Sequence, residues 1–226
     1  MRKWGIVISV FYALILLGLI VPGAIFLEGY KKFEGAELLL LPSVIKAYHD
    51  WMLWLLIAAI LACQAFLLFL SVDTSQKRLK PRTHILVSVT VGALLTGFLS
   101  SAVIWSLGFA IRGDNFWDKF FDKQYNLLLF WAALWLVWGI LFYFYFRNSS
   151  AVVTRLISWL LKGSVLELLI AVPCHIIVRR RHDCSAPVAT SFGIATGLAI
   201  MLLSFGPSVL FLYKKRLDSY SPHRPV

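Results

Sequence analysis

Six apolar stretches take up most of this chain of 226 residues, and they determine the solvent in which it folds. A helix of about 20 apolar residues, rising 1.5 Å per residue, crosses a hydrocarbon core about 30 Å thick. Helices suit lipid because each satisfies its backbone hydrogen bonds within one segment. We therefore predict an all-α polytopic membrane protein with a single transmembrane domain over residues 1–226 and no soluble domain. Its six predicted spans are 5–27, 51–72, 84–111, 127–146, 164–178 and 188–213.

Composition and charge agree with this class of protein. Hydrophobic residues make up 60% of the chain and charged residues 15%, whereas soluble domains carry about 25% charged residues. In a soluble domain the net charge of +11 would suggest nucleic-acid binding. Here the basic residues flank the spans, where Lys and Arg meet lipid head groups. We expect the lipid bilayer as a partner, together with other membrane subunits or a second copy, and no nucleic acid.

The basic residues also predict an orientation. If all six stretches cross, 13 of the 22 basic residues fall on the side that holds both termini. Cytoplasmic loops carry the excess of Lys and Arg in membrane proteins. We therefore expect a multi-pass protein of the plasma membrane or the bacterial inner membrane, with a cytoplasmic N-terminus.

The fifth stretch is short for a span, and its flanks are unusual. Residues 164–178 end in Arg179, Arg180 and Arg181, on the side that should be poor in basic residues. The span either begins earlier, with 156–161 contributing, and crosses at a tilt, or it is a re-entrant hairpin. We favour the full span.

Residues 151–162 precede that stretch and have an amphipathic helical pattern. Thr154, Arg155, Ser158 and Lys162 recur at helical spacing, and apolar residues fill the remaining positions. This pattern predicts a short interfacial helix that lies on the membrane. Arg155 and Lys162, with the three arginines at 179–181, are the predicted contacts to lipid head groups.

Small residues mark the predicted helix-packing faces. The third stretch carries Ser88, Gly92, Thr96 and Ser100 at four-residue spacing, and the sixth carries Gly193 and Gly197. Small residues let helices approach closely in lipid, where burial of apolar surface gives no driving force of its own. We expect the third and sixth spans to be central, which does not separate packing within the chain from dimerisation.

The fourth stretch carries an aromatic stripe. Trp131, Trp135, Trp138 and Phe142 share one face of a helix at the spacing i, i+4, i+7 and i+11. We interpret the stripe as a wall that faces lipid or a partner. The alternative is a surface that holds a pigment, a quinone or a lipid tail.

Glu167 is the only carboxylate inside any predicted span. An ionisable residue at membrane depth is costly and is therefore a candidate functional residue. Glu167 and His175 share one helical face, unless Pro173 breaks the register. Glu167 either pairs with Lys162, Arg155 or another arginine, or forms a proton or cation relay with His175. We expect Gln64 in the second span to hydrogen-bond a neighbouring helix or to line the same path.

Two cysteines and two histidines lie close together in the sequence. Cys174, His175, His182 and Cys184 are residue types that bind zinc, although their spacing differs from the usual zinc motifs. In an oxidising compartment, a Cys174–Cys184 disulfide is the alternative, and in the cytosol both are expected to be thiols.

No motif in the chain names an activity. The sequence has no phosphate-binding glycine loop, no dinucleotide fingerprint, no HExxH and no haem-attachment motif, and it indicates no cofactor. We expect no enzyme but an accessory or scaffold subunit of a membrane assembly. One alternative is a small transporter or channel with a path lined by Glu167 and His175. The other is a metal or thiol redox protein that uses Cys174, His175, His182 and Cys184.

Overall fold

A computed structural model describes residues 2–29, 44–46, 48–49, 51–73, 81–113, 124–147, 152–181 and 186–220. These residues form helices and turns, and none of them lies in a strand. The main elements are α1 (Arg2–Ile15), the π-helix η1 (Leu16–Ile20), α2 (Val21–Gly29), α4 (Trp51–Asp73), α5 (Pro81–Arg112), α7 (Gln124–Phe146), α8 (Val152–Arg181) and α9 (Ala186–Tyr220).

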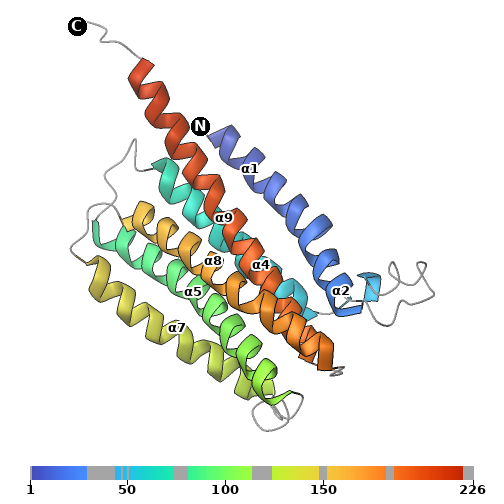
Figure 1. Cartoon of the computed structure of the whole chain (residues 1–226). Helices are drawn as coiled ribbons and strands as arrows, with labels where there is room; N and C mark the ends of the chain where they lie inside the picture. The colour runs from blue at the N-terminus through green and yellow to red at the C-terminus, as the bar shows by residue number, and fades with distance from the viewer. Residues whose placement is uncertain are drawn as a thin grey trace, which may run out of the picture.

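The long helices run up and down beside one another, so the start of α1 and the end of α9 lie at the same end of the bundle (Figure 1). Among the described residues, five segments are long and apolar enough to cross a membrane, and a shorter apolar helix covers Leu53–Leu68 within α4. The five segments are Ile6–Leu27, Ile85–Arg112, Asn126–Phe146, Val152–Arg181 and Ala186–Phe205. The predicted class, an all-α polytopic membrane protein, is confirmed.

The two ends of the bundle are distinguished by their residues. At one end α5 and α8 finish and α9 begins, and we call it the arginine end after Arg179–Arg181. The opposite end, where α1 begins and α9 finishes, is called the terminal end. Glycine stops α5 at the arginine end, because Gly113 adopts a φ of 62° and its N–H binds the Phe109 carbonyl at 2.9 Å. The Arg181 guanidinium binds the next carbonyl, that of Ala110, at 2.5 Å and so joins α8 to α5.

A π-helical turn lets the first span continue past a proline. Pro22 has no N–H, and in a regular helix its ring would collide with the preceding turn. In η1 the N–H of Val21 instead binds the carbonyl of Leu16, five residues back. The Leu17 carbonyl is left without a helical donor, and the Tyr48 hydroxyl donates to it. Burial raises the pKa of Tyr48 above its ordinary value, so this phenol stays a donor at neutral pH.

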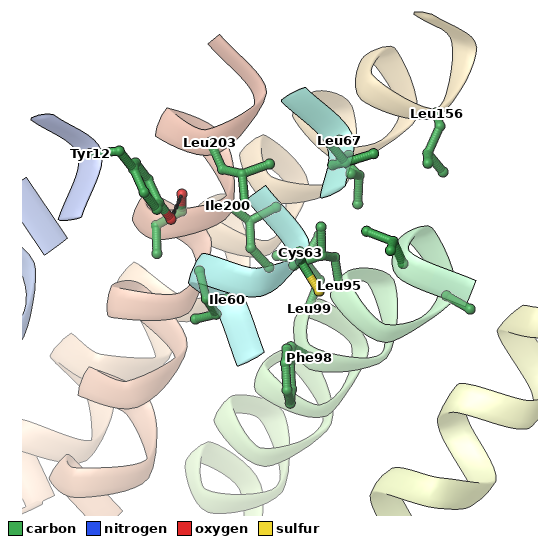
Figure 2. Close-up of a cluster of buried hydrophobic side chains, with 14 of the residues drawn as sticks. Tyr12, Ile60, Cys63, Leu67, Leu95, Phe98, Leu99, Leu156, Ile200 and Leu203 are labelled. Atoms are coloured by element: carbon green, nitrogen blue, oxygen red, sulfur yellow. Dashed lines mark hydrogen bonds between the residues drawn. The ribbon is translucent and has the colours of Figure 1, made fainter. Parts of the chain in front are cut away.

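The core is built around α5 and α9, which are the most enclosed of the membrane-crossing segments. α5 packs against α7, α8 and α9, and α8 also packs along α9. Gly92 of α5 permits the close approach of α8, because a Cβ atom at this position would stand 2.3 Å from Leu156 Cδ1. Figure 2 shows part of the main apolar cluster, to which α1, α4, α5, α8 and α9 all contribute. The central position of α5 and α9 agrees with their rows of small residues.

The prediction of a separate interfacial helix at 151–162 is wrong, and so is the re-entrant alternative for 164–178. From Val152 to Arg181 the chain is one helix of 30 residues. The residues before and after 163 form one helix because the buried positions of the first part continue at helical spacing into those of the second. Val153, Leu156 and Leu160 continue directly into the buried residues Ser164 and Glu167. The amphipathic pattern was real, since the predicted polar positions are exposed, but it marks the outer face of a long span.

Most of the aromatic stripe of α7 faces α5, which contradicts its interpretation as an outward wall, while Trp135 stays 40% exposed. Trp138 Nε1 donates to Ser100 Oγ at 2.8 Å, and Trp135 Nε1 donates to the Thr90 carbonyl at 3.2 Å. Phe142 is buried in the main apolar cluster. The remaining side of α7 is largely exposed and equally apolar. Because both sides of this helix are apolar, periodicity alone could not identify the packed one.

Candidate functional site

Glu167 lies halfway along α8, about 20 Å from either end at 1.5 Å per residue. Its side chain is 1% exposed and points at two glycines of α9. A Cβ atom on Gly197 would stand 1.8 Å from Glu167 Oε2, and one on Gly193 would stand 3.2 Å from Oε1. The carboxyl group therefore occupies space that exists only because both residues are glycine.

No hydrogen bond to the described residues satisfies either carboxyl oxygen of Glu167. The predicted pairing with Lys162 or Arg155 is wrong, because both of these cations are exposed while Glu167 is buried. Lys162 precedes Glu167 by five residues, which places it about 140° away around the helix at 3.6 residues per turn. In α5 and α9, residues 85–111 and 186–205 contain no ionisable side chain. A buried carboxylate without a partner is among the most costly groups in a protein interior.

Ser106 of α5 shares this space with the carboxyl group. Its Oγ stands 2.8 Å from the position that a Cβ of Gly193 would take, and Glu167 Oε1 stands 3.2 Å from the same position. Ser106 Oγ is also buried without a hydrogen-bond partner among the described residues. Two unsatisfied polar groups from different helices thus converge on one glycine. We call Ser106, Glu167, Gly193 and Gly197 the polar pocket.

His175 lies two turns beyond Glu167 on the same buried face of α8, with Ala171 between them. Pro173 does not break this register, because α8 continues through it and Pro173 is exposed on the outer face. His175 Nδ1 lies 2.7 Å from Thr190 Oγ1 of α9. The Thr190 hydroxyl also lies 3.2 Å from the carbonyls of Ala186 and Pro187. The Thr190 hydroxyl has one proton to donate, and a carbonyl of its own helix accepts that proton. The hydrogen bond to His175 then runs the other way, from Nδ1–H of His175 to the threonine oxygen.

These polar groups form a row that runs from the arginine end to the middle of the membrane. On α9, Thr190, Gly193 and Gly197 follow one another at successive turns of one face, as spacings of three and four residues require. We call the set His175, Thr190, Ser106 and Glu167 the polar row. The structure brings together the predicted pair Glu167 and His175, and it adds Ser106 and Thr190.

Apolar side chains close the bundle between Glu167 and the terminal end. Each is no more than 4% exposed, and α5, α8 and α9 contribute equally. Figure 2 labels Leu95, Leu99, Leu156, Ile200 and Leu203 among them. The six residues, which we call the apolar plug, are Leu95, Leu99, Leu156, Leu160, Ile200 and Leu203. The hydroxyls nearby do not open a polar path, because Ser164 and Ser204 each donate to a carbonyl of their own helix.

Gln64 is buried in α4 but does not belong to the polar row. Its neighbour Cys63 is part of the main apolar cluster. No hydrogen bond joins Gln64 to Glu167, and its Oε1 has no partner among the described residues. The prediction that Gln64 hydrogen-bonds a neighbouring helix therefore finds no support at this oxygen, and for the amide nitrogen it stays a prediction.

The predicted cysteine and histidine site is only partly within the described residues. Cys174 is a free, buried thiol that packs with Trp105 and Phe109. His182 and Cys184 lie outside the described residues, so the metal and disulfide hypotheses remain predictions. Across the ranges that the structure describes, no three His, Cys, Asp or Glu residues gather as a metal site would require. Arg155, Lys162, Arg180 and Arg181 are exposed, and their contact with lipid head groups also remains a prediction.

The predicted packing residues lie at helix interfaces. On α5, Ser88 is buried, and Ser100 Oγ donates to the Thr96 carbonyl at 2.8 Å while it accepts from Trp138. Gly193 and Gly197 lie between α8 and α9 and are also part of the polar pocket. Sequence reasoning missed Ser106 and Thr190. For Thr190 a signal existed, because it lies on the same helical face as the two glycines.

The fold and the polar row define an integral membrane protein with an ionisable group enclosed halfway along one of its membrane-crossing helices. Comparisons with protein-family models, with curated proteins and with solved structures find no match to this chain.

Proposed function

We propose that this protein is a small membrane transporter that binds a proton, or a small cation in its place, at Glu167. The observation that carries the proposal is the unpartnered carboxyl group buried halfway through the membrane. A group of this kind is costly to keep in a bundle. A purely structural helix interface would be more stable with an apolar side chain at this position.

The polar row supports a route to this site from the arginine end. His175 and Thr190 lie near the ends of α8 and α9, and Ser106 lies between them and the carboxyl group. A proton entering from this end passes from group to group, with water filling the gaps between hydroxyls. Arg179 of α8 lies one turn beyond His175, toward the arginine end.

The apolar plug favours a transporter over an open channel. In this conformation, packed leucine and isoleucine side chains separate Glu167 from the terminal end. A site that opens toward one end and is closed toward the other corresponds to one state of an alternating-access cycle. Release toward the terminal end would require α9 to move relative to α5 and α8.

The test is proton movement into proteoliposomes, followed with a pH-sensitive dye in the lumen. We expect the wild-type protein to carry protons down an imposed gradient and Glu167→Gln to abolish the flux. Lys162→Gln is the matched control, since it removes a charge from the exposed face of the same helix. Infrared difference spectra across a pH titration give a separate readout, in which we expect a protonated-carboxyl band that Glu167→Gln removes.

Two results would overturn the proposal. The first is a wild-type protein that carries no flux and lacks the infrared band, which would mean that Glu167 exchanges no proton. The second is a flux that persists at full rate in Glu167→Gln, which would mean that the path lies elsewhere in the protein.

We also propose that both termini lie in the cytoplasm, so that the arginine end faces the outside. The distribution of basic residues along the chain supports this orientation. A membrane-impermeant maleimide applied to intact cells tests it through Cys184. Cys63 and Cys174 are buried and should contribute little background. Labelling of intact cells, before or after reduction, supports the orientation, and labelling only after permeabilisation contradicts it.

An accessory or scaffold role is the second candidate, and α7 favours it. This helix packs mainly on α5, and its other side exposes large apolar residues such as Leu136, Ile140 and Phe144. A partner helix could cover this side in place of lipid. Gentle extraction followed by mass measurement tests the role: co-purifying subunits lost in Ile140→Trp would support it, and a bare monomer would contradict it.

A further inference from the structure

A partly open cavity of about 330 Å³ lies on the side of α9 that faces away from Glu167. The first span contributes Leu16 and Ile20, α4 contributes Ile57 and Ile60, and α9 contributes Ala195 and Ala199. Trp131 of α7 also reaches the cavity. We call this space the α9 slot. It is separate from the polar row, since Gly193 and Gly197 face α8 instead.

The lining of the α9 slot suits a hydrocarbon. Apart from Trp131, its polar side chains are Ser191 and Thr196, and both hydroxyls already donate to carbonyls of their own helix. No charged residue lines it within the part of the chain that the structure describes. This lining therefore offers a ligand apolar contact along its length and no charge to pair with a polar head group.

The dimensions of the α9 slot match half of a bilayer. Along α9 it extends from Val188 to Ala199, which is about 16 Å at 1.5 Å per residue. A hydrocarbon core about 30 Å thick gives each leaflet about 15 Å. The slot begins near the arginine end, where α9 starts, and it ends near mid-membrane. Its volume lies at the lower end of the range for ligand pockets, about 300–1,000 Å³.

We propose that the α9 slot binds one acyl chain of a membrane lipid from the leaflet at the arginine end. The occupant follows from the surroundings, because the walls belong to membrane-crossing helices and the slot is partly open. The neighbouring solvent is lipid, whose chains lie roughly parallel to these helices. A chain in the slot replaces empty space between α4, α9 and the first span, and so restores the dispersion contacts that a void lacks.

The test uses a phosphatidylcholine that carries a photoactivatable diazirine near the end of one acyl chain. After illumination of reconstituted protein, mass spectrometry locates the cross-linked peptides. We expect cross-links concentrated at residues 16–25, 53–60 and 188–199 rather than spread over the exposed side of α7. Ala195→Trp fills the slot and should lower these cross-links about tenfold, the change that 1.4 kcal/mol produces. Val137→Trp on the exposed side of α7 is the matched control and should leave them unchanged.

A second variant separates loss of lipid binding from a folding defect in Ala195→Trp. Ala24→Phe fills the slot from the opposite wall, so loss of cross-linking in either variant, with thermal stability retained, supports the proposal. Cross-links distributed evenly over all outward faces, and unaltered by both substitutions, would overturn it. So would native mass spectra in which a quinone, or a second copy of the chain, is retained in place of phospholipid.

Discussion

The close contact between Gly197 and Glu167 gives the sharpest prediction about the site. In Gly197→Ala, the new methyl group would stand 1.8 Å from Glu167 Oε2 and 2.9 Å from Leu168 Cγ. Adding a methyl group to a packed interior costs about 1–3 kcal/mol. Alanine regains about 1 kcal/mol over glycine in a helix. We expect a net loss of about 0–2 kcal/mol in the free energy of unfolding.

Because this net loss can be small, the decisive quantity is the coupling between the two positions. Glu167→Ala removes the carboxyl group that the new methyl group meets and leaves only the contact with Leu168 Cγ, so in that background Gly197→Ala should cost less. We expect a coupling energy of about 1–2 kcal/mol in the double-mutant cycle, well above the scatter of about 0.5 kcal/mol for independent sites. Unfolding in mixed micelles, followed by circular dichroism, measures all four proteins.

Gly139→Ala on α7 is the matched control for this cycle. A Cβ atom at Gly139 would meet only Ala93 Cβ, at 3.9 Å, which is an ordinary contact. We expect this variant to be neutral or more stable by up to about 1 kcal/mol. If Gly197→Ala costs the same with and without the carboxyl group, then Glu167 does not pack against Gly197 and the polar pocket is wrong.

Five further variants test three local features through the free energy of unfolding. Tyr48→Phe should cost about 1–3 kcal/mol, because the carbonyl that it caps has no other donor. Tyr12→Phe should cost less, since the carbonyl that it binds keeps its helical partner; equal losses would contradict our account of the π turn. Gly113→Ala should cost about 1–2 kcal/mol at its positive φ, and a neutral result would contradict the left-handed cap. Thr190→Val should cost about 1–3 kcal/mol, because it leaves the buried His175 Nδ1 without a partner. Thr190→Ser keeps the hydroxyl and should be nearly neutral. Equal effects of the two substitutions would contradict the hydrogen bond.

α9 has a different role on each of its two sides. Toward α8 it presents glycines, which make room for a carboxyl group. Toward the first span and α4 it presents Ala195 and Ala199, which line the α9 slot. Small residues on both sides explain why this helix can be central and still leave space next to it. The transport and lipid proposals therefore rest on different faces of one helix and can fail independently.

The predictions that held were those that depend on the chain's local chemistry. The apolar stretches alone predicted the class of protein, because spanning a bilayer requires length and hydropathy and little else. The helical period placed Glu167 and His175 on one face, and the structure keeps them there. The predictions that failed concerned boundaries and neighbours. The helix through 151–162 was separated from the next span because its charged residues suggested a membrane surface.

The sequence by itself determined that this chain crosses a membrane several times and carries one carboxyl group inside a predicted span. Tertiary structure decided what that carboxyl group meets: two glycines and a serine instead of Lys162 or Arg155. It also decided that the tryptophans of α7 face α5, and that α9 borders a cavity. The physical reason is that hydropathy and helical period are properties of one segment. In lipid, the choice of neighbouring helix depends on shape and on where small residues permit close approach, and only the packed bundle contains that information.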